Sequence, residues 1–198
     1  RDALQLVLVA LVILGVGVVA YSRIFDSVPA DVLTIRALDG QVTHATSSGE
    51  QAPEVGTVLR SSDRILTGAG GRVELSLGER AELTLGGDSA LALVGSDADG
   101  VQVELENGLV QAVVRPGVGP GLSVVAAGRV ARAEDAEFSV GLGRDGTTAV
   151  EARAGQVTLV NYGDVARLDA GQQVLVPRTG EPTLVEIPKS LLLEVAWP

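Results

Sequence analysis

The chain lacks cysteine and has a single histidine, His44, among its 198 residues. Without cysteine it can form no disulfide and offers no thiolate to a metal ion. A lone histidine builds neither a two-histidine metal site nor, in this context, a histidine-based triad. His44 falls on a predicted strand beside Thr43 and Thr46, where we expect an exposed or half-exposed side chain. We therefore predict no enzyme, with no catalytic residue, metal site or cofactor.

Aromatic residues are also scarce, at 3% of the chain. Single-stranded nucleic-acid sites rely on aromatic platforms for stacking, so this class of ligand is not expected, and we predict no small-molecule substrate. The formal net charge is −10, and residues 1–26 add nothing to it because their two arginines balance their two aspartates. The excess acid lies downstream, where it repels phosphate backbones, so we predict no nucleic-acid partner.

A long apolar run occupies the N-terminal region. From Ala3 to Tyr21 the only clearly polar residue is Gln5. About twenty apolar residues span a bilayer as a helix, and a cleaved signal peptide has a shorter apolar core that ends in small residues. We therefore predict a retained transmembrane anchor over residues 1–26 that places these side chains in the membrane: Leu4, Leu8, Leu11, Leu14, Val18 and Tyr21. Arginines on both sides of the run leave its orientation undetermined by charge.

After a linker at residues 27–31, the sequence alternates apolar and polar residues in short runs separated by glycines. The stretch from Gly68 to Val94 shows this best, and the period of two predicts half-buried strands. No helical period of useful length follows the linker. The predicted strands lie near 32–38, 41–46, 63–67, 72–77, 80–85, 90–94, 101–105, 108–114, 121–126, 129–133, 136–142, 147–153, 156–161, 164–168, 172–176 and 183–187.

These strands predict one all-β domain over residues 32–187, either irregular and β-solenoid-like or a rolled sandwich. The apolar tail at 188–198 is expected to lead into further sequence. Turns are predicted where an acidic residue or asparagine precedes glycine, because positive φ is easiest there: Asp39-Gly40, Asp99-Gly100, Asn107-Gly108 and Asp145-Gly146. The Asp97–Gly100 segment has the acidic spacing of a calcium loop but no glutamate at the twelfth position, so a hairpin is expected.

A loose repeat runs through the predicted domain, in which glycine is followed by one residue and then valine. Its uneven spacing favours an irregular winding over a strict solenoid. We expect each glycine to turn a corner and each valine to enter the core. The copies are DGQVT at 39–43, GGRVE at 70–74, NGLVQ at 107–111, AGRVA at 127–131 and AGQVT at 154–158.

The order of these motifs resembles the FecR domain. The resemblance runs from Gly40 to about Val176 and rests on D-R-I-L-T-G at 63–68, R-V-E-L-S-L-G at 72–78, L-E-N-G-L-V-Q-A at 105–112, F-S-V at 138–140, T-A-V-E-A-R-A-G-Q-V at 148–157 and L-D-A-G-Q-Q at 168–173. It implies an extracytoplasmic, all-β, solenoid-like domain behind one membrane span. Anti-sigma regulators of this family sense a TonB-dependent transporter and relay iron-siderophore status to a cytoplasmic sigma factor.

Two classes of function remain open. In the first, the chain is a membrane-anchored periplasmic sensor or signal-relay module that binds another envelope protein or further copies of itself. In the second, it is a structural or scaffolding component of a cell-envelope complex, in a collar or ring around a membrane machine. A module associated with the surface or peptidoglycan is a third, weaker class. Both main classes imply a single-pass protein of the bacterial inner membrane with its β domain in the periplasm.

The sequence suggests two means of contacting a partner. The acidic cluster Glu134, Asp135 and Glu137 is expected to serve solubility, and its functional alternative is a contact surface for a basic partner. An open β domain also has edge strands that accept a partner's strand through main-chain hydrogen bonds. We therefore expect docking by strand addition, although the sequence does not show which strand is the edge.

Overall fold

The computed structural model describes residues 32–97, 100–117, 121–179 and 182–186. The predicted anchor at 1–26, the linker at 27–31 and the tail at 188–198 lie outside these described residues. Within the part of the chain that the structure describes, no helix has the length and apolar character needed to cross a membrane.

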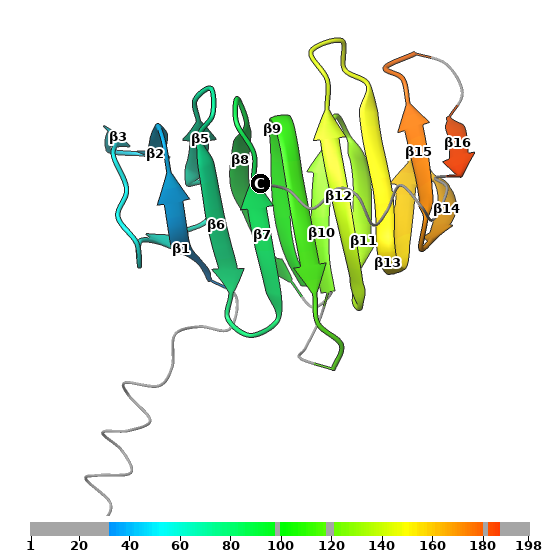
Figure 1. Cartoon of the computed structure of the whole chain (residues 1–198), viewed down its shortest axis with the longest axis horizontal. Coiled ribbons are helices and arrows are strands. Elements are labelled where there is room, and N and C mark those ends of the chain that lie inside the picture. The colour runs from blue at the N-terminus through cyan, green and yellow to red at the C-terminus, as the bar shows by residue number, and fades with distance from the viewer. Residues whose placement is uncertain (1–31, 98–99, 118–120, 180–181, 187–198) are drawn as a thin grey trace, which may run out of the picture. The chain divides into compact units, whose positions relative to one another are not determined.

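All regular elements of the described residues are β-strands, which confirms the all-β prediction (Figure 1). The strands are β1 (Leu33–Asp39), β2 (Val42–Thr46), β3 (Gly49–Gln51), β4 (Val58–Leu59), β5 (Arg64–Thr67), β6 (Arg72–Leu77), β7 (Ala81–Leu85), β8 (Ala90–Asp97), β9 (Gly100–Val114), β10 (Gly121–Ala126), β11 (Arg129–Ala133), β12 (Ala136–Leu142), β13 (Thr148–Asn161), β14 (Asp164–Asp169), β15 (Gln172–Val176) and β16 (Thr183–Glu186). The short strands β3 and β4 were not predicted.

The strands pair in two sheets, which we call sheet A and sheet B. Sheet A has the order β4-β1-β6-β7-β9-β12-β13-β15-β16. Sheet B has the order β3-β2-β5-β8-β9-β10-β11-β13-β14. Only β9 and β10 pair in parallel among the described strands. The chain passes repeatedly from one sheet to the other. The colours in Figure 1 run in chain order across the strands.

The long strands β9 and β13 belong to both sheets. The first half of β9 pairs with β8 and β10 in sheet B, and its second half pairs with β7 and β12 in sheet A. Likewise β13 pairs first with β12 and β15 and then with β11 and β14. The pairs β9-β10-β11-β13-β12-β9 therefore close a mixed barrel of five strands, and the other strands flank it.

The predicted hairpin turn at Asn107-Gly108 is wrong. The chain continues as β9 through Gly108, which has a φ of +87° and bends the strand from sheet B into sheet A. Gly155, with a φ of +71°, lies at the corresponding bend of β13, so the two strands predicted on either side of it are one. Alternation of apolar residues breaks at a bend much as it does at a reversal, so the pattern did not distinguish them.

The core lies between the sheets and is built almost entirely from small aliphatic side chains. The alternation in β6 and β7 is confirmed, since Val73, Leu75, Leu83 and Leu85 are at most 1% exposed. Phe138 is the largest fully buried side chain of the described residues. In four of the five glycine-valine repeats the valine is buried, as predicted: Val42, Val73, Val110 and Val157. In the copy at 127–131 the glycine turns the β10–β11 hairpin as predicted, but the prediction for the valine is wrong, because Val130 is only partly buried and faces outward.

Candidate protein-interaction surface

Four strands of the described residues form the edges of the sheets. β3 and β4 lie at one end of the strand orders, and β14 and β16 lie at the other. Figure 1 shows β3 at one side of the domain and β14 and β16 at the opposite side. The longest is β14, with six residues, and it pairs only with β13 in the described part of the chain. An edge strand of this length exposes a row of backbone groups on which another strand can pair.

The hairpin that precedes β14 determines which backbone groups point outward. Asn161 and Asp164 are opposite each other, and Tyr162 and Gly163 form a two-residue turn with φ values of +48° and +99°. Such a turn is closed by a hydrogen-bonded pair, and hydrogen-bonded and open pairs then alternate along the ladder. The outward groups are therefore those of every second residue, beginning at Val165.

Three residues of β14 have these outward groups: Val165, Arg167 and Asp169. The N–H of Asp169 donates to Oε1 of Gln172 over 2.9 Å, which agrees with the assignment and caps this end of the strand. The backbone groups of Val165 and Arg167 have no partner among the described residues. They are the open hydrogen-bonding positions of this edge.

A row of valines crosses the outer face of sheet B and ends at this edge. Val125, Val130, Val160 and Val165 lie opposite one another on β10, β11, β13 and β14. The first three are partly buried, and Val165 is 65% exposed. Tyr162, in the turn between β13 and β14, is 79% exposed. Exposed apolar surface that is continuous across several strands is typical of an interaction site.

A row of polar residues runs parallel to the valines, two positions away from them on each strand. It consists of Ser123, Arg132, Thr158 and Arg167. Arg132 lies 3.6 Å from Glu134, whereas Arg167 is exposed and forms no ion pair with a described residue. Arg132, Thr158 and Arg167 line an open groove of about 350 Å³ together with Glu134 and Asp135. The edge thus presents an apolar position beside a cationic one.

The structure separates the predicted acidic cluster into two parts. Glu134 and Asp135 are exposed where the chain passes from β11 in sheet B to β12 in sheet A. Glu137 lies on β12, opposite Val113 in sheet A, and its carboxylate is 4.0 Å from Arg153. Nothing in these contacts decides between solubility and binding, so the role of the cluster stays a prediction.

The expectation that His44 is exposed is wrong. Its side chain is buried, on the same face of β2 as Val42, and Nε2 lies 3.1 Å from Oδ2 of Asp63. The same carboxylate oxygen accepts the backbone N–H of Arg60 over 2.9 Å. The pair joins β2 to the turn before β5. His44 therefore has a structural role, and a period-two pattern that starts at Val42 was the signal for its burial.

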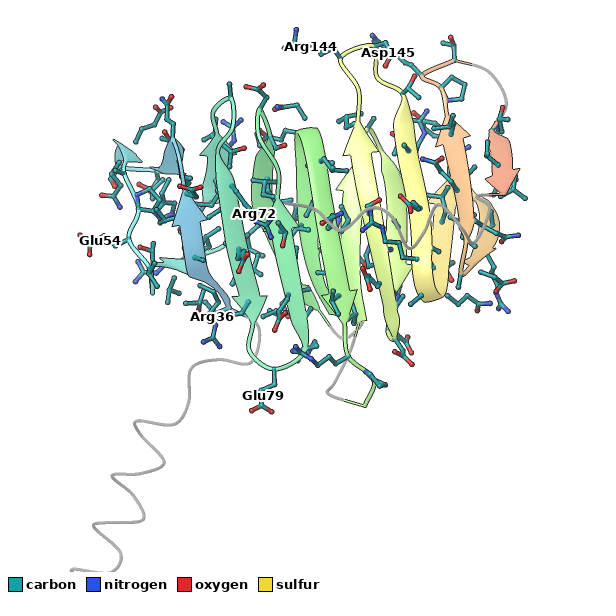
Figure 2. All side chains as sticks on the ribbon, in the orientation of Figure 1. Arg36, Glu54, Arg72, Glu79, Arg144 and Asp145 are labelled. Carbon is teal, nitrogen blue, oxygen red and sulfur yellow. The ribbon has the colours of Figure 1, made fainter. Side chains whose placement is uncertain are left out.

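We expect replacement of Asp63 by alanine to destabilise the domain by about 2 kcal/mol, because a buried imidazole and a backbone N–H lose their acceptor. Urea unfolding followed by circular dichroism measures this loss. Glu79→Ala is the matched control, since this exposed carboxylate points away from the β6–β7 turn (Figure 2). Equal midpoints for the two variants would contradict the structural role of the pair.

The calcium-loop candidate at Asp97–Gly100 lies in a hairpin. Asp97 and Gly100 are opposite each other at the end of β8 and β9, which confirms the hairpin, although residues 98–99 lie outside the described residues. Among the residues that the structure describes, no group of three or more histidine, cysteine, aspartate or glutamate side chains is placed to hold a metal ion.

In the described part of the chain, two surface groups have shifted pKa values, and both shifts have local causes. A hydrogen bond to Glu106, followed by its charge, raises the pKa of Arg64. The backbone N–H and hydroxyl of Thr147 lower the pKa of Asp145 in the hairpin between β12 and β13, where Arg144 and Asp145 lie at the tip (Figure 2). These contacts order exposed connections and do not converge on a cleft.

The sequence predicted strand 164–168 but not its place in the sheet. Edge strands in water carry charge and alternate like any half-buried strand, so Asp164, Val165 and Arg167 did not stand out. The one local signal was the Tyr162-Gly163 turn, which fixes the outward residues once the strand is known to be an edge.

Comparison with known proteins identifies the domain. Residues 63–158 match the model of the family described as FecR protein, a shorter range than the resemblance from Gly40 to Val176. The matched residues extend from the start of β5 into β13, and they include the barrel strands except the end of β13. Comparison with curated proteins gave no match.

Two solved structures have a similar fold. Both are crystal structures of a candidate anti-sigma factor from Parabacteroides distasonis ATCC 8503, with a TM-score of 0.56 in each case. The identities are 22% and 23%, and each match covers 63% of this chain. The chain spans 59% of the length of that protein, and at these identities the likeness shows the fold alone. The family match alone identifies a FecR domain, at residues 63–158 of this chain.

Proposed function

We propose that the chain is a membrane-anchored FecR module of the bacterial periplasm that relays a signal by binding another envelope protein. The observation that carries this proposal is the FecR match over residues 63–158. The fold shared with a candidate anti-sigma factor is consistent with a signalling role. The apolar run from Ala3 to Tyr21 supplies the predicted single membrane span, and the domain follows it after a short linker.

The geometry supports binding through a sheet edge. The two sheets share β9 and β13 and enclose a close-packed aliphatic core, so the domain presents β14 from a rigid support. Partner binding at such an edge needs no rearrangement of the core. A docking event is then passed to the membrane through residues N-terminal to β1, and the β domain itself performs no chemistry in this proposal.

The absence of cysteine makes the membrane topology directly testable. Ser47 is exposed in the turn between β2 and β3, so Ser47→Cys introduces one accessible thiol into an otherwise thiol-free chain. In cells with a permeabilised outer membrane, we expect a membrane-impermeant maleimide to label this thiol. Val73→Cys, at a fully buried position, is the control and should react only after denaturation. Labelling of Ser47→Cys only after the inner membrane is broken would place the domain in the cytoplasm and overturn the proposal.

The scaffolding alternative draws on the free edges at both ends of the sheets, which suit assembly into a larger structure. Deletion of residues 32–186 separates the two functions. A relay predicts altered transcription of the genes it controls with the neighbouring membrane proteins still assembled. A scaffold predicts the reverse, namely loss of a membrane complex with transcription unchanged.

A further inference from the structure

We propose that β14 is the docking edge, and that the partner contributes an antiparallel strand with an apolar side chain opposite Val165 and an acidic side chain opposite Arg167. This inference rests on the proposed function, since it specifies how the module would bind an envelope protein. In an antiparallel pair the residue opposite Arg167 precedes the one opposite Val165 by two positions. The partner strand therefore reads acidic, any residue, apolar.

The four described edges differ in what they offer. β3 and β4 have three and two residues. In β3 only the backbone N–H and C=O of Glu50 point outward, because the hydrogen-bonded Thr46–Gly49 pair closes its hairpin. β16 has four residues. β14 has six residues and two open positions, each with a free N–H and C=O. An incoming strand can thus form four main-chain hydrogen bonds at Val165 and Arg167, more than β3 permits.

The side chains around these positions specify the sequence of the partner. An apolar residue opposite Val165 extends the row that already contains Val130 and Val160, and it covers a side chain that is 65% exposed. An acidic residue opposite Arg167 meets a guanidinium that forms no ion pair with a described residue. Opposite charges that face each other across two strands stabilise the pairing of those strands.

A second copy of β14 meets these requirements poorly. Two antiparallel β14 strands with their outer faces on the same side pair around one central residue. If the central residue is Val165, Ala166 or Arg167, the residue of the second copy that lies opposite Arg167 is a glycine, a valine or an arginine, respectively. Only centring on Leu168 places Asp169 there, and the Asp169 N–H is already bonded to Gln172. The occupant we infer is therefore a strand from a different protein.

Amide hydrogen exchange on the folded chain tests this edge with a defined probe. The probe is the capped peptide Thr-Thr-Glu-Thr-Val-Thr-Thr, and its partner control has lysine in place of glutamate. With the glutamate peptide at about ten times its Kd, exchange at the Val165 and Arg167 amides should slow about tenfold. The amides of Ala166 and Leu168 already bond to β13 and should change little. The lysine peptide should bind more weakly.

Matched variants distinguish pairing at β14 from binding elsewhere on the domain. Val165→Pro removes an outward N–H and leaves the bonds to β13, so it should abolish the protection at Arg167. Glu50→Pro removes the outward N–H of β3 and should have no effect. Arg167→Glu should weaken binding of the glutamate peptide and strengthen that of the lysine peptide, which keeps the test decisive if Val165→Pro fails to fold.

Three results would overturn the inference: protection centred on β3 or β16, equal binding of the two peptides, or a concentration-dependent dimer of the unmodified chain that Val165→Pro dissolves. The last result would assign β14 to a second copy. None of them depends on where the domain lies in the cell, so a failed Ser47→Cys labelling test is distinguishable from failure of the edge.

Discussion

A Gly155→Ala variant is expected to lose about 3 kcal/mol of its free energy of unfolding, enough to unfold a marginally stable domain. Gly155 lies at the bend of β13 with a φ of +71°, and a Cβ there would lie 2.1 Å from the carbonyl oxygen of Asp135 and 2.9 Å from Cα of Ala136. Both neighbours are backbone atoms, Asp135 in the connection before β12 and Ala136 at the start of β12, so relief requires the strands themselves to move.

Gly70→Ala is the matched control for the variant at Gly155. Gly70 has the same φ of +71°, and a Cβ there would have nothing within 4 Å. Its cost is that of the left-handed backbone alone, about 1–2 kcal/mol. Denaturant unfolding of both variants isolates the clash, because the conformational cost is common to them. Equal losses at the two positions would show that the bend of β13 is not tightly packed against residues 135–136.

The second large effect is expected at Arg129, whose side chain is 2% exposed. Its guanidinium donates from Nη1 to Oγ1 of Thr148 over 3.1 Å and from Nη2 to the carbonyl oxygen of Pro177 over 2.6 Å. Among the described residues, Nε has no hydrogen-bond partner and no carboxylate forms an ion pair with this side chain. A buried charge held only by neutral groups ties the start of β11 to β13 and to the end of β15.

Arg129→Ala should cost about 3 kcal/mol, because buried oxygens on two segments lose charged donors at once and a cavity remains. Arg129→Lys should recover little, since one ammonium group cannot reproduce the fork that reaches both Thr148 and Pro177. Thermal and urea unfolding measure both losses. Arg144→Ala, in the exposed tip of the β12–β13 hairpin, is the control and should fall within about 0.5 kcal/mol of the parent. Destabilisation by Arg144→Ala as large as that by Arg129→Ala would contradict a specific role for burial.

Period-two alternation predicted most strands within a residue or two, because half-buried strands such as β6 and β7 must place Val73 and Leu83 inward and Glu74 and Glu82 outward. It could not show that β9 and β13 each continue through a glycine, since that depends on contacts with distant chain segments. Gly108, for example, is enclosed by Ser89, and Gly155 by the Asp135 carbonyl. Those neighbours are known only once the sheets are assembled.

The candidate site was less predictable than the fold, for a related reason. Whether β14 lies in the centre or at the edge of a sheet depends on which strands pair with it, and the sequence of β14 does not show which strands those are. The burial of His44 could have been predicted from the sequence, because Val42 and His44 share a face of β2. The acidic residues Glu134, Asp135 and Glu137 were assigned to one cluster by their closeness in sequence. The passage of the chain between sheets at this point separates the third from the first two.

The shared strands also determine how the domain bears mechanical load. A force applied to β14 by a bound partner acts first on β13, which is hydrogen-bonded in sheet B to β11 and β14 and in sheet A to β12 and β15. Tension that reaches β13 is thereby divided between both sheets, because its two halves are hydrogen-bonded in different sheets. A partner bound at β14 as proposed would therefore pull on both sheets of a domain that has no disulfide to share the load.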